Sequence, residues 1–134
     1  MVAKKYSRYS YISDLLAERL YLLYSAMRKT GRYQSLVDIS RTIELMPMPV
    51  HYISVLQAQR CYSLYFFMHK KLDYKYIGKQ ILYNSFIKRC KDLRSNRPEL
   101  SDSQVIREAL LSEAPCAGLS EGQIRRILRS KGAR

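Results

Sequence analysis

Arginine is the residue type whose spacing in this chain best suits a defined chemistry. Arg125, Arg126 and Arg129 lie close together near the end of the sequence, and Lys131 follows them. On a helix these cations would face away from an inner apolar stripe, which consists of Leu119, Ile124, Ile127 and Leu128. A guanidinium group can donate two parallel hydrogen bonds to a guanine edge or pair with a phosphate. The spacing therefore predicts a nucleic-acid-binding helix, with a solvated basic face as the alternative.

The N-terminal segment offers a second set of cations. Lys4, Lys5 and Arg8 alternate with Tyr6 and Tyr9. Arms of this composition contact phosphates or stack on bases. A frayed basic terminus without a binding role is an equally valid interpretation.

The overall charge points to a polyanionic partner. The 134 residues contain 24 Lys and Arg against 11 Asp and Glu, which gives a net charge of +13. Such a surface binds nucleic acid by releasing condensed counterions. We expect DNA in preference to RNA, although the sequence contains no motif that separates the two.

Residues that could support catalysis or hold a metal are sparse. His51 and His69 have no cysteine or carboxylate at metal-ligand spacing, and no glycine-rich phosphate loop is present. We therefore expect no enzyme activity, no cofactor and no metal. His51 lies in a proline-containing segment and is expected to be solvated.

Three cysteines at scattered positions favour a reduced, cytoplasmic protein over a disulfide scaffold: Cys61, Cys90 and Cys116. No uncharged apolar run is long enough to cross a bilayer, and no signal peptide is evident. We expect no membrane association.

Apolar periodicity predicts an all-α protein of about six helices. The expected helices cover residues 12–30, 35–46, 54–70, 74–96, 101–112 and 120–131. Ser-x-x-Gln capping boxes should begin three of them, at Ser54, Ser101 and Ser120, and Asp73 should cap a fourth. The helix after Ser54 is apolar nearly all round, so Leu64 and Phe67 are expected to be buried.

The sequence pattern predicts an internal repeat at an offset of 66 residues. Pro49 aligns with Pro115, Gln57 with Gln123, and the apolar register also holds. A fixed period of this kind indicates duplicated structural units. The predicted organisation is a basic arm (1–10), a first three-helix unit (11–70) and a second unit with the basic helix (71–134), which share a core.

These features together predict a non-enzymatic DNA-binding protein with a helix-turn-helix-like C-terminal unit, acting as a transcription regulator or an accessory factor of DNA transactions. One feature is against the specific motif, because its connection is usually only three or four residues long. The alternative is a helical adaptor or assembly subunit that binds an acidic protein partner or forms a homodimer. Exposed methionines in the Met46–Val50 segment would favour that alternative.

Overall fold

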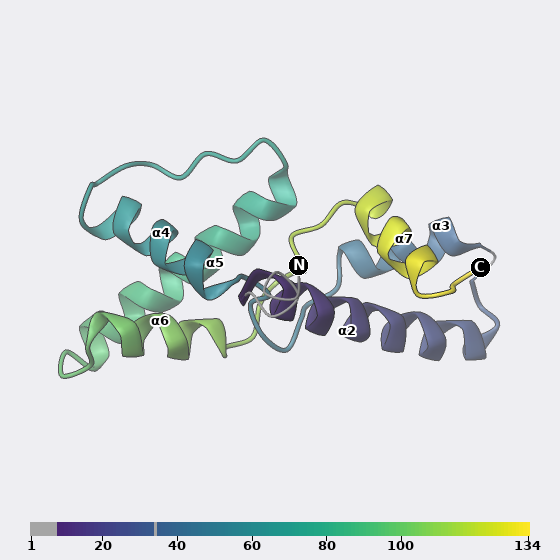
Figure 1. Ribbon diagram of the computed structural model, residues 1–134, viewed down its shortest axis with the longest axis horizontal. Helices are drawn as coiled ribbons and strands as arrows, with labels where there is room; N and C mark the ends of the chain where they lie inside the picture. Colours follow the sequence, from purple (N-terminus) through teal and green to yellow (C-terminus); the bar gives the residue numbers. More distant parts are fainter. Residues whose placement is uncertain (1–7, 34) are drawn as a thin grey trace.

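The computed structural model describes residues 8–33 and 35–134, with the side chains of residues 8–13 left out of the description. The predicted all-α architecture is confirmed. Figure 1 shows six helices, which are α2 (Arg8–Thr30), α3 (Leu36–Glu44), α4 (Val55–Phe66), α5 (Ile77–Asn96), α6 (Asp102–Leu110) and α7 (Glu121–Ser130). The described residues form no strand, only an isolated antiparallel bridge between Met48 and Ala114.

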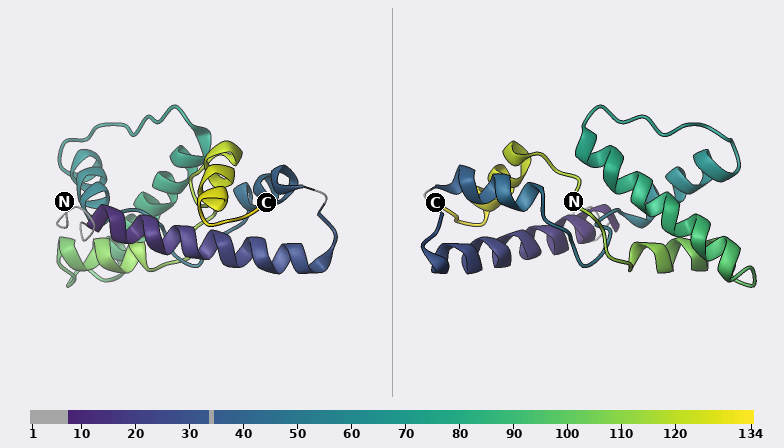
Figure 2. Two further views of the ribbon diagram at one scale, coloured as in Figure 1. Left: turned by 45° about the vertical axis from the view of Figure 1, so that its right-hand side comes forward. Right: turned by 180° about the vertical axis from the view of Figure 1, so that it is seen from behind.

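The helices gather into two groups that lie side by side along the long axis of the molecule. Lobe A consists of α2, α3 and α7, and lobe B consists of α4, α5 and α6. The views in Figure 2 keep the same grouping. The third helix of each sequence half therefore packs with the first two helices of the other half. Helix α4 also contacts α2, which links the lobes.

The two lobes match closely in the positions of their helices along the chain. Helix α3 covers residues 36–44, and α4 begins at residue 55. Adding 66 to these positions gives 102 and 110, the bounds of α6, and 121, the first residue of α7. The two residues of the isolated bridge, Met48 and Ala114, also lie 66 positions apart. We call residues at this offset equivalent. A common origin of the two halves is compatible with this register and stays a prediction.

Side chains of equivalent residues fill the two cores. In lobe A, Leu20, Ile39 and Leu128 are fully buried, and in lobe B their equivalents Phe86, Val105 and Tyr62 are buried too. Each helix buries one apolar stripe because residues three and four apart share a face. The lobes thus use the same positions with different side chains.

The predicted helix starts are confirmed at three serines. The Oγ atoms of Ser54, Ser101 and Ser120 each accept a hydrogen bond from the backbone N–H three residues later. The glutamine side chain completes a reciprocal capping box at Ser101 and Ser120. Each box satisfies two backbone N–H groups that a helix start leaves unpaired.

Two predictions about the α4–α5 region are wrong. Helix α4 ends at Phe66, Leu64 is only half-buried, and the Phe67 side chain is 56% exposed. The apolar run continues past the end of the helix, and His69 adopts a left-handed φ of 54°. The helix is therefore not buried on most sides.

Helix α5 begins at Ile77 and not at residue 74, and Asp73 does not cap it. The Gln80 side chain explains the late start. Its Oε1 accepts from the Tyr74 N–H at 2.8 Å, and its Nε2 donates to the Leu72 carbonyl at 3.2 Å. These two bonds hold the preceding segment outside the helix.

The connections between the lobes run antiparallel through the centre of the molecule. Met48 and Ala114 exchange two backbone hydrogen bonds of 2.9 Å, and the His51 N–H donates to the Leu110 carbonyl at 2.9 Å. Met48 is 1% exposed, so the Met46–Val50 segment does not present both of its methionines. The connection therefore places Met48 in the core, while Pro47 and Pro49 on either side of it stay exposed.

The prediction that His51 is solvated is wrong, since its side chain is 2% exposed. Its Nδ1 lies 2.9 Å from the Ser112 carbonyl and its Nε2 lies 2.8 Å from Ser85 Oγ. A carbonyl can only accept, so neutral His51 carries its proton on Nδ1 and accepts from Ser85. Burial lowers the pKa of His51.

Candidate nucleic-acid interface

Helix α7 presents arginines on its outer face because its inner face is fixed in the core. Ile124 and Leu128 are fully buried against lobe A, whereas Arg126 and Arg129 are exposed. The helix packs chiefly against α3 and also against α2. The predicted inner stripe is therefore buried at Ile124 and Leu128, whereas Leu119 and Ile127 are half-buried.

The predicted arginines differ in their freedom to bind a ligand. Arg125 is half-buried, and its Nε lies 3.1 Å from Glu121 Oε2 in an ion pair without hydrogen-bond geometry. Arg126, Arg129 and Lys131 are exposed and form no ion pair with any residue that the structure describes. Arg126 and Arg129 are thus the stronger candidates.

The structure adds cations that the sequence did not link to α7. The C-terminal turn of α2 lies beside the end of the chain, where Tyr24 exchanges hydrogen bonds with the backbone of Arg134 at 3.1 and 3.2 Å. The Arg28 guanidinium also donates to the Arg134 carbonyl and lies 5.7 Å from the centre of the Tyr24 ring. The bond from the Arg134 backbone and the nearby Arg28 lower the pKa of Tyr24.

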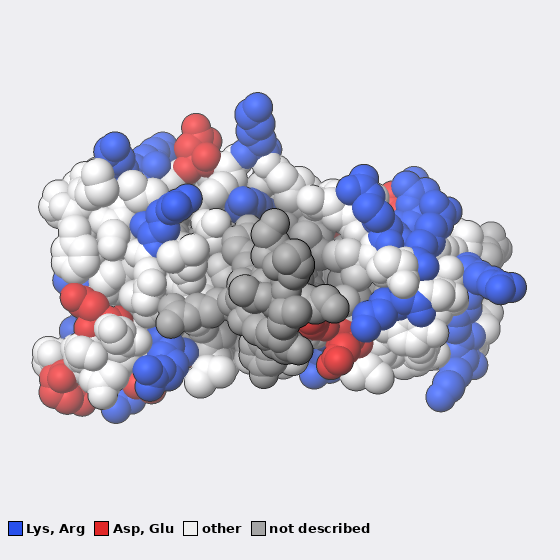
Figure 3. Space-filling view, in the orientation of Figure 1, with Lys and Arg blue, Asp and Glu red and all other residues white. Residues whose placement is uncertain are grey.

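These contacts bring the end of α2 to the basic end of α7. Lys29 and Arg32 are exposed there and make no ion pair among the described residues. Figure 3 shows Lys and Arg side chains gathered over this end of lobe A. We call the set Lys29, Arg32, Arg126, Arg129 and Lys131 the arginine face. Basic residues in the last turn of α2 were visible in the sequence, but no local pattern places them next to α7.

The predicted contact residues near the N-terminus lie mostly outside the part of the chain that the structure describes. Lys4 and Lys5 lie outside the described residues. Arg8 is the first residue of α2, and its side chain is also outside the description. The structure therefore brings together the C-terminal candidates and leaves the N-terminal candidates as predictions.

The helix-turn-helix arrangement is not formed by consecutive helices. Helices α6 and α7 do not pack together, and neither do α3 and α4. The connections between them cross to the other lobe, so α7 packs on α3 and α4 packs on α6. The neighbour that supports the basic helix comes from the other half of the sequence.

Two arginines of lobe B, Arg94 and Arg97, lie beside acidic residues. Arg97 lies 2.9 Å from Glu108, and Arg94 lies 3.4 Å from Asp102. Arg94 also donates to the Tyr62 hydroxyl at 2.5 Å, and that hydroxyl donates to Asp102 at 2.6 Å. Burial, followed by the bond to Asp102, raises the pKa of Tyr62 to about 12. These two arginines are exposed but already have partners within lobe B.

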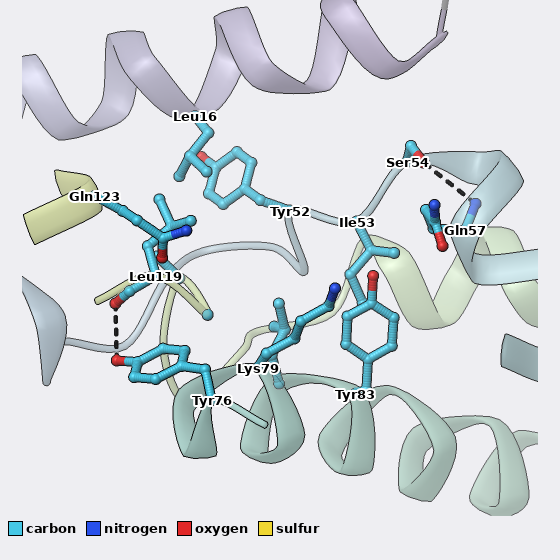
Figure 4. Close-up of a pocket in the computed structure, with 13 residues that line it drawn as sticks. Leu16, Tyr52, Ile53, Ser54, Gln57, Tyr76, Lys79, Tyr83, Leu119 and Gln123 are labelled. Carbon is cyan, nitrogen blue, oxygen red and sulfur yellow. Dashed lines mark hydrogen bonds between the residues drawn. The ribbon is translucent and has the colours of Figure 1, made fainter. Parts of the chain in front are cut away.

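A pocket of about 310 Å³ lies at the junction of the lobes (Figure 4). Tyr52, Gln57 and Gln123 approach it from different elements, and the Tyr76 hydroxyl lies 3.0 Å from the Leu119 carbonyl. Lys79 is the charged residue of its lining, and the Lys79 Nζ lies over the rings of neighbouring tyrosines. The lining contains no acid–base pair that would support proton transfer.

Two further kinds of feature are absent from the described part of the chain. It contains no group of three or more His, Cys, Asp or Glu residues that could hold a metal ion. None of its described helices is long and apolar enough to cross a membrane. Comparison with protein-family models, with curated proteins and with solved structures found no match.

Proposed function

We propose that the protein is a non-enzymatic nucleic-acid-binding protein that uses the arginine face of lobe A, with duplex DNA as the preferred target. The observation that carries the proposal is the exposure of Arg126 and Arg129 without an acidic partner in the described structure. The role would be that of a transcription regulator or an accessory factor of DNA transactions in the cytoplasm.

The exposed guanidinium groups of α7 have no acidic partner among the described residues to give up when they bind a phosphate. An arginine that pairs with a carboxylate, like Arg97, gives up that pair when it binds a phosphate. Arg126 and Arg129 have no such pair to lose, so their contact with a phosphate releases counterions from the DNA without an opposing loss. Gln123 and Arg126 are exposed three residues apart on α7, which gives this face a neutral hydrogen-bonding group as well.

The test is a pair of matched double variants on duplex DNA. Arg126→Ala with Arg129→Ala should weaken binding and reduce the slope of log affinity against log salt by about 1.8, since each phosphate contact contributes about 0.9. The control, Arg60→Ala with Arg107→Ala, removes two exposed arginines that lie outside the arginine face. Both variants lower the net charge by the same amount.

Equal loss of affinity in the two variants would show that only net charge matters. Unchanged affinity and slope in the Arg126/Arg129 variant, with helicity retained by circular dichroism, would refute the proposal. If one of the two arginines contacts a base edge, affinity should fall by about 1–3 kcal/mol for the preferred sequence only. Parallel titrations with single-stranded DNA and structured RNA identify the preferred nucleic acid.

An adaptor function is favoured by exposed apolar side chains. Leu45 is 82% exposed and its equivalent Leu111 is 67% exposed. Such side chains can dock a protein partner or a second copy of the chain. For this alternative, Leu45→Ser with Leu111→Ser should abolish self-association or partner binding and leave DNA binding unchanged.

A further inference from the structure

Lobe B has a basic groove that no prediction from the sequence identified. It lies between α5, the end of α4 and the segment 67–76, and its volume is about 510 Å³. Lys71, Lys88 and Lys91 line it, together with Gln80 and Asn84, and no carboxylate does. We call it the lysine groove.

The groove is held in shape by the Gln80 side chain. Besides its bonds to the backbone of segment 67–76, Gln80 Nε2 donates to Asn84 Oδ1 at 2.9 Å. Leu72, in the middle of the segment, is buried and anchors it to the core. The bond to Oδ1 leaves the Asn84 N–H groups without a hydrogen-bond partner among the described residues. The groove therefore offers amide donors beside its ammonium groups.

The three lysines are free to bind an anion. Lys71, Lys88 and Lys91 are exposed and form no ion pair with another described residue. Lys91 Nζ lies 4.7 Å from the centre of the Tyr65 ring, so this contact covers a face of the ring that a base could otherwise stack on. The nearest acids in sequence, Asp73 and Asp92, are exposed and do not line the groove.

We propose that the lysine groove is a second binding surface for backbone phosphates of the same nucleic acid that contacts the arginine face. This inference rests on the proposed function. An ammonium group acts as a point charge and lacks the planar fork with which arginine recognises a base edge. The groove therefore supplies affinity without sequence preference, while any base recognition comes from the arginine face.

The positions of the two surfaces permit one nucleic acid to contact both. Figure 3 shows basic side chains on both lobes, over α7 of lobe A and at the upper edge over segment 67–76 of lobe B, where an acidic side chain lies among them. Helix α2, with 23 residues, is roughly 35 Å long and belongs to lobe A. A duplex longer than about one helical turn, or roughly 10 base pairs, is therefore long enough to extend beyond lobe A.

The experiment compares salt dependence on duplexes of two lengths. On a duplex of about 24 base pairs, Lys71→Gln with Lys88→Gln should reduce the log–log slope by up to about 1.8. The loss of affinity should be the same for every sequence. The matched control, Arg60→Gln with Arg107→Gln, should change the slope much less. On a duplex of about 8 base pairs, which offers fewer phosphates for joint contact, the lysine variant should differ less from the control.

A charge-retaining variant separates the phosphate role from a structural one. Lys71→Arg with Lys88→Arg should restore the affinity and slope of the unmodified protein. Loss of helicity in the glutamine variant, or failure of the arginine variant to bind, would overturn a purely electrostatic role.

The outcomes distinguish this inference from the proposed function. If the Arg126/Arg129 variant loses binding but the lysine variant matches the control on the long duplex, the lysine groove is refuted and the arginine face stands. If neither variant differs from the control, both proposals fail. A lysine effect that is equal on the short and long duplexes would refute joint binding of one nucleic acid by the two lobes.

Discussion

Lobes A and B have the same helix order and matching helix bounds, yet they differ in what their arginines contact. In lobe A, Arg126 and Arg129 on the third helix are exposed. In lobe B, Arg94 and Arg97 at the end of the long helix are paired with acids. Lobe B also carries three exposed arginines without an ion pair to any described residue, Arg60, Arg89 and Arg107, so the lobes differ at particular positions and not in whether they have free arginines.

The difference is strongest on the third helices. Arg125 and Arg129 of α7 are equivalent to Gln59 and Ser63 of α4, whereas Arg126 is matched by another exposed arginine, Arg60. Both helices bury one apolar stripe, with Ile124 and Leu128 in α7 and Ala58 and Tyr62 in α4. The buried face of a helix therefore determines where it packs, while the outer face is free to differ. A shared architecture consequently does not imply that both lobes bind the same groups.

The largest expected effects test whether the two cores are equivalent. Leu20 and Phe86 are equivalent and both are 0% exposed. Leu20→Ala should cost about 2–5 kcal/mol and Phe86→Ala about 3–5 kcal/mol, because each leaves a cavity in its lobe. Chemical denaturation measures both values.

Phe67→Ala is the control for these cavities, since that side chain is more than half exposed. Its cost should remain below about 1 kcal/mol. A small effect of either Leu20→Ala or Phe86→Ala would show that one of the lobes is loosely packed and that the comparison between them fails.

Local signals in the sequence were sufficient to predict the helices. Serine caps at Ser54, Ser101 and Ser120 act within one helical turn, so the sequence identifies them without tertiary information. The pairing of the helices was not predictable in this way. The apolar stripes of α4 and α7 could each pack on either pair of helices, and only the path of the two central connections decides between them.

The wrong prediction for His51 and the missed cations near the end of α2 also result from contacts between segments that are far apart in the sequence. A proline-containing segment usually lies at the surface, which led to the wrong expectation for His51. Here the two connections pair with each other between the lobes and bury the imidazole. Similarly, nothing local indicates that Lys29 and Arg32 lie near α7, so that part of the candidate interface required the fold.

The junction of the lobes should respond to pH through His51. Burial lowers the pKa of His51 in the folded protein, so below its usual value of about 6.5 the unfolded chain binds the proton more readily. Stability should therefore fall as pH falls through about 6.5, until the lower pKa of the folded state is reached. Thermal unfolding between about pH 7.5 and 5.5 measures this loss.

His51→Gln removes the titrating group and should flatten this pH dependence. At pH 7.5 the same variant should be less stable by about 1–3 kcal/mol, since it leaves buried partners such as the Ser112 carbonyl poorly satisfied. His69→Gln, at an exposed position, is the matched control and should behave like the unmodified protein. If His51→Gln keeps the pH profile of the unmodified protein, groups other than His51 cause the loss of stability at low pH.

The caps of the two third helices provide a smaller test of equivalence. Ser54→Ala in lobe B and Ser120→Ala in lobe A should each cost about 1 kcal/mol, because each leaves a first-turn N–H without its acceptor. Ser103→Ala, at an exposed position inside α6, is the control. If the two cap variants differ by several kcal/mol, one third helix contributes far more to folding than the other.

The smallest expected effect concerns a position where the two cores differ in chemistry. Ser40 in α3 is fully buried, and its Oγ has no hydrogen-bond partner among the described residues, whereas its equivalent in lobe B is Ile106. An unpaired buried hydroxyl is unfavourable, so its removal costs little stability or adds some. Ser40→Ala should therefore change the free energy of unfolding by between zero and about 1 kcal/mol in the stabilising direction. Denaturant titration of this variant beside Ile106→Ala, which should cost about 2–5 kcal/mol, measures the contrast. A clear destabilisation by Ser40→Ala would mean that the hydroxyl makes a favourable interaction and that the α3 core of lobe A depends on a polar contact that lobe B lacks.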